Sequence, residues 1–240
     1  MNRFPAEPAA TMLWFDLDDT LWDMSGNSAI CLREIYDSAH LDCLFATPEE
    51  WDRVYHGINL TLWEQYGNGE ITRDYLRSER FARPLRLAGM AEDEAAGLSA
   101  QLDPLYLGLL GRKTSLIVGA RETLDYLSAR GYRMGIVSNG FHEVQYNKMR
   151  SSEIDGYFDI VVLSDDAGYN KPDPRFFDYA LEKAGSRGKR NIVIGDNPTA
   201  DIEGALNAGL EAVMYRRRHD TGVYPGVTNI DRLTDLKTIF

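Results

Sequence analysis

The sequence predicts a three-layer α/β protein that carries an inserted, all-helical second domain. Short apolar runs alternate with helical segments through the second half of the chain, which is the pattern of a parallel sheet with helices on both faces. These runs are continuous and rich in β-branched residues, as in strands that are buried on both faces. A long helical segment separates the first run from the second. At 240 residues, the chain has room for one core and a smaller domain.

Five apolar runs are expected to form the strands of this sheet. They are residues 11–15, 132–138, 158–163, 191–195 and 211–215. Helices are expected between the later strands, at residues 121–129, 143–149, 174–183 and 200–207. The last four strands therefore form one βαβ series, and their connections leave no room for a second insertion.

The interval between the first and second strands is expected to form a separate helical domain. It holds about 115 residues, whereas a crossover between parallel strands needs only about a dozen. Apolar residues recur there with helical spacing in four segments, residues 29–39, 49–66, 72–87 and 92–110. We therefore expect the helical domain at residues 23–110 and the core at residues 11–22 and 111–240, with residues 1–10 disordered.

The composition excludes several classes of partner. Lys and Arg number 26 against 37 Asp and Glu, so the formal net charge of −11 would repel nucleic acid polymers and anionic lipids. No apolar run approaches the roughly 20 residues that span a bilayer. We expect no nucleic acid or membrane partner and a cytoplasmic location. Cys31 and Cys43 have no histidine at metal-binding spacing and are expected to be buried in the helical domain rather than to act as nucleophiles.

Polar residues follow the expected strands at the points where those strands end. The first strand runs into Asp16 and Asp18, and residues two apart in an extended backbone point to the same side. The second strand ends in Ser138 and Asn139 before a helix, where free backbone N–H groups favour an anion. Ligands of parallel sheets bind at this edge. Helix capping and an ordinary turn are the structural alternatives for these residues.

Two further segments add charge at the same edge. Lys171 directly precedes Pro172, and Pro172 and Pro174 stiffen its loop, although a loop lysine is usually solvated. The fourth strand ends at Asp196, and Asp201 follows at a helix start, where capping is the alternative explanation. Asp16, Asp196 and Asp201 would crowd negative charge into one pocket, and a divalent cation such as Mg²⁺ would stabilise that arrangement.

Four segments together resemble a known family. FDLDDT, SNG, KPDP and GDNPTAD, in this order, resemble the four motifs of the haloacid dehalogenase superfamily of phosphohydrolases. The helical insert is similar to that superfamily's type 1 cap, and the resemblance implies a Rossmann-like core. The SNGF form of the second motif and residues 62–72 of the insert resemble bacterial pyrimidine 5′-nucleotidases.

The resemblance implies a covalent mechanism with Mg²⁺ as the cofactor. Asp16 would attack phosphorus to give an aspartyl phosphate. Asp18 would protonate the leaving alcohol and later deprotonate the attacking water. The Asp16 and Asp196 side chains and the Asp18 carbonyl would bind the metal, with Asp201 supporting it.

The remaining implied residues would hold the substrate. Ser138, the Asn139 amide and Lys171 would bind the phosphoryl oxygens. Trp63, Tyr66 and Phe141 are candidates for stacking on a base, although aromatic residues at helical spacing more often build a core. The basic run at residues 216–219 is interpreted as a solvated loop, with a gate that attracts anions as the alternative.

These observations predict a Mg²⁺-dependent phosphomonoesterase for nucleoside 5′-monophosphates, with pyrimidine deoxynucleotides favoured. The expected partner is thus a small phosphorylated substrate, and the oligomeric state is not predicted. A phosphatase or phosphomutase for a small sugar phosphate would keep the same motifs. An inactive binding protein on the same fold is a second alternative, which the convergent charges disfavour. A dehalogenase would not need the acid at Asp18 or the metal carboxylates.

Overall fold

The chain divides into two compact units. A computed structural model describes residues 7–217 and 222–240. Met1–Met24 together with Thr114–Phe240 form one unit, which contains the sheet, and Ser25–Lys113 form the other, which is helical. We call them the sheet unit and the helical unit. None of the helices in the described residues has both the length and the apolar character of a membrane span.

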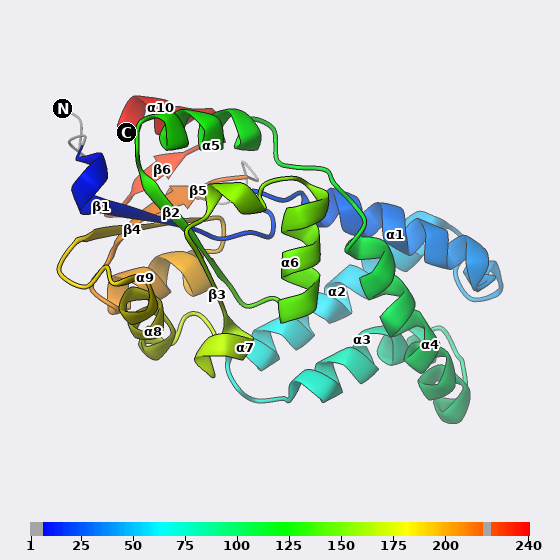
Figure 1. The fold of residues 1–240 in the computed structure, drawn as a ribbon. Helices are drawn as coiled ribbons and strands as arrows, with labels where there is room; N and C mark the ends of the chain where they lie inside the picture. The colour runs from blue at the N-terminus through cyan, green and yellow to red at the C-terminus, as the bar shows by residue number, and fades with distance from the viewer. Residues whose placement is uncertain (1–6, 218–221) are drawn as a thin grey trace. The chain divides into compact units, whose positions relative to one another are not determined.

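The sheet unit contains six parallel strands in the order β3-β2-β1-β4-β5-β6 (Figure 1). The predicted parallel α/β fold is therefore confirmed. Five strands lie at or near their expected positions, whereas the short edge strand β6 was not predicted, because its three residues carry too little pattern. The strands are β1 (Thr11–Phe15), β2 (Arg133–Ser138), β3 (Ile160–Leu163), β4 (Arg190–Gly195), β5 (Glu211–Tyr215) and β6 (Thr228–Ile230).

Helices cover both faces of this sheet (Figure 1). The face that includes Met12, Trp14 and Val193 packs against the helices α8 and α9, while α5 and α10 lie on the other side. The core is thus a three-layer sandwich. Its helices are α5 (Ala120–Ala129), α6 (His142–Ser151), α7 (Ser164–Ala167), α8 (Pro174–Ala184), α9 (Gly204–Asn207) and α10 (Leu236–Ile239). Its 3₁₀ turns are Pro8–Ala10, Asp155–Tyr157 and Leu233–Asp235.

The segment after β4 differs from the single helix expected at residues 200–207. Pro198–Glu203 forms a π-helical turn, and only Gly204–Asn207 is α-helical. The wider turn arises because the Ile202 N–H donates to the Asn197 carbonyl, five residues back, at 3.3 Å. Apolar spacing cannot distinguish these two forms of helix over so few residues.

The start of the chain is more ordered than expected. Residues 1–6 lie outside the described residues, but Pro8–Ala10 forms a 3₁₀ turn directly before β1. Pro8 has the φ angle that a first helical residue needs, and the Ala10 N–H donates to the Glu7 carbonyl at 3.1 Å. The prediction of disorder is therefore wrong for residues 8–10.

The helical unit holds the helices of the insert. Thr47 and Thr72 cap two of them by accepting hydrogen bonds from the N–H groups three residues on, at 3.1 and 3.2 Å. Buried aromatic rings, among them Trp51, Tyr55 and Phe81, pack in its interior. The helices are α1 (Met24–Ser38), α2 (Pro48–Gly67), α3 (Arg73–Leu87) and α4 (Glu92–Leu110), with a 3₁₀ turn at Leu41–Cys43.

The two cysteines have different environments. Cys31 is buried, and burial raises the pKa of its thiol to about 11, so it is a poor nucleophile. Cys43 is exposed, which corrects the expectation that both are buried. It ends the 3₁₀ turn that follows His40, a residue in the left-handed conformation, and this reversal leaves Cys43 at the surface.

Candidate active site

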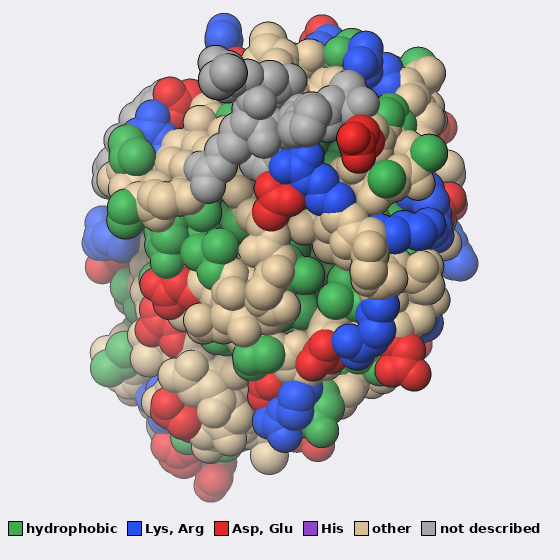
Figure 2. Space-filling model, turned by 90° about the vertical axis from the view of Figure 1, so that its left-hand side faces the viewer, with side chains coloured by type: hydrophobic (Ala, Val, Ile, Leu, Met, Phe, Trp, Pro, Cys, Tyr) green, Lys and Arg blue, Asp and Glu red, His purple; other side chains and the backbone are tan. Residues whose placement is uncertain are grey.

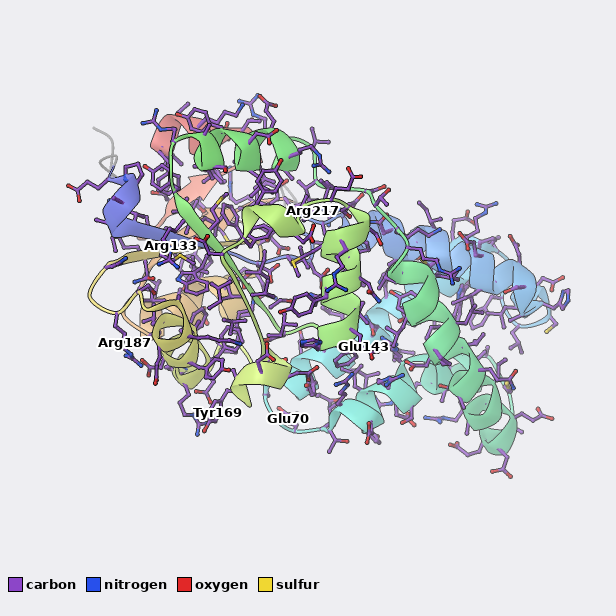
Figure 3. The ribbon with its side chains drawn as sticks, viewed as in Figure 1. Glu70, Arg133, Glu143, Tyr169, Arg187 and Arg217 are labelled. Atoms are coloured by element: carbon purple, nitrogen blue, oxygen red, sulfur yellow. The ribbon has the colours of Figure 1, made fainter. Side chains whose placement is uncertain are left out.

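The candidate site lies at the carboxyl ends of the central strands. Asp16 directly follows β1, Ser138 ends β2, and Asp196 directly follows β4. Because β1 pairs with both β2 and β4, these three residues meet at one edge of the sheet. Figure 3 places Arg133, the first residue of β2, and Arg217, which follows β5, toward opposite ends of the strands.

Three carboxylates form the centre of the site. One oxygen from each of Asp16, Asp196 and Asp201 lies within 4.8 Å of the others. Burial, and then the neighbouring carboxylates, raise the pKa of Asp16 to about 7 against the opposing Lys171 ammonium, and raise the pKa of Asp196 well above its usual range. Clustered carboxylates are an oxygen-only donor set, and a bound divalent cation would offset their mutual repulsion.

Lys171 joins this cluster from the loop before α8. Its Nζ lies 2.7 Å from Asp16 Oδ1 and 2.6 Å from Asp201 Oδ1, and it donates to the Val137 carbonyl at 2.8 Å. Burial lowers the pKa of Lys171, but the two carboxylates outweigh burial and hold that pKa above its usual range. The ammonium therefore stays protonated and fixes the Asp16 carboxylate.

The Asn139 side chain positions the lysine loop. Its Nδ2 donates to the Lys171 carbonyl at 2.9 Å, and its Oδ1 accepts from the Lys171 N–H at 2.8 Å. Both atoms of the side-chain amide are thus bonded to the backbone of the residue that fixes Asp16. The SNG and KPDP segments form one structural pair, although 30 residues lie between them.

Close packing brings Asp201 to the carboxylate cluster. A Cβ on Gly195 would lie 2.3 Å from Asp201 Oδ2, so only glycine fits at the end of β4. The same oxygen accepts from the Asn197 N–H at 3.0 Å, while Thr20 Oγ1 donates to Asp196 Oδ1 at 3.1 Å. Asp201 is 1% exposed, and its carboxylate accepts from both Lys171 and the Asn197 backbone.

Asp18 is held separately from the three carboxylates. Lys148 Nζ donates to its Oδ1 at 2.7 Å, and Gln145 Nε2 donates to its Oδ2 at 2.9 Å. The loop around Asp18 is tight, because the Trp22 N–H donates to the Leu17 carbonyl at 2.8 Å. The two aspartates of the first motif therefore have different partners, although they lie two residues apart.

Three side chains of the site were not identified from the sequence. Gln145 and Lys148 lie on one face of α6, four and seven residues after Phe141, and both are buried. Two polar residues on the buried face of a helix are the signal that would have identified them. Thr20 lies in the FDLDDT segment, and its hydroxyl donates to Asp196 Oδ1.

The aromatic candidates for substrate contact lie in different units. Trp63 and Tyr66 are both in α2 of the helical unit, with ring centroids 5.6 Å apart in an edge-to-face arrangement. Both are partly exposed. Phe141 precedes α6 in the sheet unit and is 3% exposed, so its ring presents little surface in this structure. Contact with the substrate stays a prediction for all three.

The basic run after β5 is only partly described. Arg216 pairs with Asp231, and Arg217 pairs with Asp19 and Asp23, which flank the loop after β1. The two side chains are about one-fifth exposed. The interpretation of the basic run as a solvated loop is therefore wrong for these two arginines, because both form ion pairs with acidic residues. Residues 218 and 219 lie outside the described residues.

Charges of both signs are interspersed on the face drawn in Figure 2, rather than gathered into a field of one sign. The carboxylates and lysines of the candidate site are held instead by buried pairs such as Lys171 with Asp16.

Comparison with known proteins agrees with the fold. Residues 12–209 match the family of haloacid dehalogenase-like hydrolases. The chain belongs to this family of hydrolases, and the resemblance noted in its four motifs is confirmed.

The relatives include enzymes with different substrates. The putative HAD-hydrolase YfnB of Bacillus subtilis is 30% identical in sequence over 83% of this chain and 81% of its own. Its magnesium-bound crystal structure matches with a TM-score of 0.83 and 29% identity, and the match covers 96% of this chain and 98% of that one. The pyrimidine 5′-nucleotidase YjjG of Escherichia coli is 29% identical over 86% of each chain. A glyceraldehyde 3-phosphate phosphatase of Methanothermobacter thermautotrophicus is 30% identical over 95% and 98%. The chain is thus similar to phosphohydrolases of small molecules.

Proposed function

We propose that this hydrolase is a Mg²⁺-dependent phosphomonoesterase that acts on nucleoside 5′-monophosphates, pyrimidine deoxynucleotides first, through an aspartyl phosphate on Asp16. One observation carries the proposal. Asp16 is fixed by Lys171 within a cluster of three carboxylates, while Asp18 is held by other partners beside it. A nucleophile and a separate proton carrier are what two-step phosphoryl transfer requires.

The carboxylate cluster fits a magnesium ion. The Asp16 and Asp196 side chains and the Asp18 carbonyl would hold it, with Asp201 supporting the ligands. All of these donors are hard oxygen atoms, which suit Mg²⁺. When bound, the ion supplies positive charge that favours the ionised carboxylates and the phosphoryl oxygens. The magnesium-bound structure of YfnB supports this assignment.

The chemistry of the chain's own residues follows from their positions. An Asp16 oxygen forms a bond to phosphorus while the bond from phosphorus to the ester oxygen breaks, and Asp18 gives its proton to that oxygen. Water then attacks the phosphoaspartate, Asp18 takes its proton, and inorganic phosphate leaves. Ser138, the backbone amide of Asn139 and Lys171 bind the phosphoryl oxygens through both steps.

The nucleotide preference rests on the helical unit, which we assign as the cap that selects the substrate. Trp63 and Tyr66 offer a pair of partly exposed rings on which a base could stack. The nucleotidase YjjG is similar over most of this chain, which supports a nucleotide. Similarity to the archaeal glyceraldehyde 3-phosphate phosphatase favours a small sugar phosphate as the second candidate.

The charge and the cysteines of the chain bear on the type of substrate and on the cellular location of the enzyme. Its substrate would be a small phosphorylated molecule rather than a nucleic acid polymer, in agreement with the net charge of −11. Free cysteines suit a reducing compartment, and we place the enzyme in the cytoplasm.

A phosphate-release screen tests the proposed function. The purified protein is assayed with deoxyuridine monophosphate, thymidine monophosphate, purine nucleotides, glyceraldehyde 3-phosphate, other sugar phosphates and p-nitrophenyl phosphate, each with Mg²⁺ and with EDTA. We expect Mg²⁺-dependent release, with the highest kcat/KM for a pyrimidine deoxynucleotide. A preference for a sugar phosphate would contradict the nucleotide assignment. No release from any compound would favour the inactive binding protein.

A further inference from the structure

We infer that Gln145 and Lys148 on α6 are positioning residues that hold the Asp18 carboxylate, one oxygen each, in the orientation needed for proton transfer. This inference rests on the proposed role of Asp18 as acid and base. Lys148 Nζ donates to Oδ1 at 2.7 Å, and Gln145 Nε2 donates to Oδ2 at 2.9 Å. The three side chains belong to the sheet unit.

The exposures of the three groups show which one is free to react. Gln145 is 0% exposed and Lys148 is 2% exposed, whereas the Asp18 side chain is 29% exposed. The donors thus lie behind the carboxylate, and the carboxylate itself retains solvent access. A solvent-accessible aspartate without such partners would rotate about its side-chain bonds and lose its alignment with the reacting oxygen.

The surroundings of Lys148 show that its ammonium depends on Asp18. Apart from Asp18, its Nζ lies over the face of Trp22, 4.7 Å from the ring centroid, and 3.7 Å from Met24 Sδ. The indole is fixed in turn, because Trp22 Nε1 donates to Ser152 Oγ at 3.0 Å. Asp18 is the single carboxylate with which Lys148 pairs in the part of the chain that the structure describes.

Gln145 connects the proposed acid to the proposed phosphate site. Besides Asp18, its Nε2 donates to Ser138 Oγ at 2.6 Å. Its Oε1 is buried without a hydrogen-bond partner in the described residues, so the amide is oriented with its donor between two acceptors. The opposite orientation would set Oε1 against the Asp18 carboxylate and repel it.

Gly140 provides the space for this arrangement. A Cβ at residue 140 would lie 2.3 Å from Gln145 Nε2 and 2.4 Å from its Cδ. The glycine of the SNG segment is therefore needed so that the amide can reach both Ser138 and Asp18. A merely structural ion pair between Lys148 and Asp18 would require neither this space nor the link to Ser138.

The test compares two substrates with different leaving groups in order to distinguish a positioning role from a purely structural one. Phosphorylation of the enzyme is measured by rapid quench with p-nitrophenyl phosphate, whose leaving group needs little protonation, and with phenyl phosphate, which needs more. Lys148→Met and Gln145→Met are compared with the wild type, with Asp18→Asn as the reference. Lys237→Met is the control, since it removes another lysine ion pair of the sheet unit, with Glu122.

We expect Lys148→Met and Gln145→Met each to lower the rate of phosphorylation by phenyl phosphate about 10- to 100-fold, as a misplaced catalytic group does. The rate of phosphorylation by p-nitrophenyl phosphate and the KM should change little. Lys148→Arg keeps a charged donor and should move the ratio of the two rates back toward the wild type. Lys237→Met should leave that ratio unchanged. If Lys148→Met fails to fold, Gln145→Met and Gly140→Ala, which displaces the amide without removing it, decide the question.

The possible results distinguish this inference from the proposed function. If the loss of phosphorylation rate depends on the leaving group in Asp18→Asn but not in the Gln145 and Lys148 variants, the positioning role is wrong and the acid role of Asp18 stands. Equal losses with both substrates would show a structural role and would also overturn the inference. If Asp18→Asn itself shows no dependence on the leaving group, the proposed mechanism is wrong.

Discussion

At the scale of single residues, two aspartates that lie two positions apart have different partners and therefore different proposed roles. Asp16 contacts the Lys171 ammonium in a buried cluster, while Asp18 accepts from Gln145 and Lys148 on the other side of the loop. The sequence identifies both as candidates by their position after β1. It cannot show the difference, because the partners of Asp18 come from a helix more than 120 residues along the chain.

Asp18→Asn should block the second half of the reaction more than the first when the leaving group is good. With p-nitrophenyl phosphate, Asp16 should still be phosphorylated, but water would lack its base, a loss of roughly 10²- to 10⁴-fold. Stopped-flow measurement should then show a burst of p-nitrophenolate near one per site, followed by slow turnover. Mg²⁺ binding is measured as the control, since the Asp18 carbonyl is a proposed ligand. Normal metal binding without a burst would contradict the assignment.

Gly195→Ala should weaken metal binding without removing a ligand. The new Cβ would lie 2.3 Å from Asp201 Oδ2, so the Asp201 carboxylate must move away from the cluster. We expect the Mg²⁺ concentration for half-maximal activity to rise about 10-fold or more, as for loss of a group that supports metal ligands. Titration of activity with Mg²⁺ measures this. Gly156→Ala is the control, because this glycine of the sheet unit has no atom within 4 Å of the added Cβ. An unchanged Mg²⁺ requirement would argue against Asp201 as a supporting group.

At the scale of elements, the loop between β1 and α1 is anchored by residues from distant segments. Arg217 follows β5 and pairs with Asp19 and Asp23 on either side of the turn, where Asp19 has a left-handed backbone with φ of 62°. The pairing resists opening of a strained loop that carries Asp18. A solvated basic run was the interpretation from sequence, because the acidic partners of Arg217 are nearly 200 residues away.

Arg217→Gln should therefore reduce activity more than the same substitution at the neighbouring Arg216. Releasing the loop would misplace Asp18, and we expect kcat to fall about 10-fold. Arg216→Gln is the matched control, since Arg216 has a similar exposure but pairs with Asp231. Steady-state kinetics and thermal melting of both variants are compared. Equal kcat values for the two variants would show that Arg217 has no particular effect on the loop.

The regular elements were predictable because each has a strong local pattern. Continuous apolar runs identified β1 to β5, and helical spacing identified the four helices of the insert. Features that depend on tertiary contacts were not predictable. The π turn at Pro198–Glu203 serves to bring Asp201 to the cluster, and α6 carries Gln145 and Lys148 to Asp18. The candidate residues at strand ends were found, whereas the side chains that hold them were not.

At the scale of the whole molecule, the carboxylate cluster links metal binding to stability and pH. In the metal-free protein the pKa of Asp16 is about 7, against an ordinary value of 3.8, and the pKa of Asp196 is raised as well. The folded state thus holds protons that the unfolded chain has lost. This stabilisation is complete below about pH 3.8 and is lost as the pH rises through about 7.

Mg²⁺ should consequently raise the melting temperature more at pH 8 than at pH 5.5. At the higher pH the carboxylates are ionised and repel one another until the ion binds, whereas at the lower pH the ion must displace protons. The difference in Tm between Mg²⁺ and EDTA is measured at each pH, which removes the effect of groups away from the site. Asp196→Asn should reduce this difference. A Tm difference that does not vary with pH would contradict the linkage.

The central claim is that Asp16 becomes phosphorylated, and identification of the modified residue tests it most directly. Asp18→Asn protein is mixed with p-nitrophenyl phosphate and Mg²⁺, quenched in acid, reduced with borohydride to convert an acyl phosphate to a stable alcohol, and digested for mass spectrometry. We predict that the modification maps to Asp16, and that Asp16→Asn shows neither the modification nor turnover while it melts as a folded protein. Modification of another residue, or turnover by folded Asp16→Asn, would contradict the account.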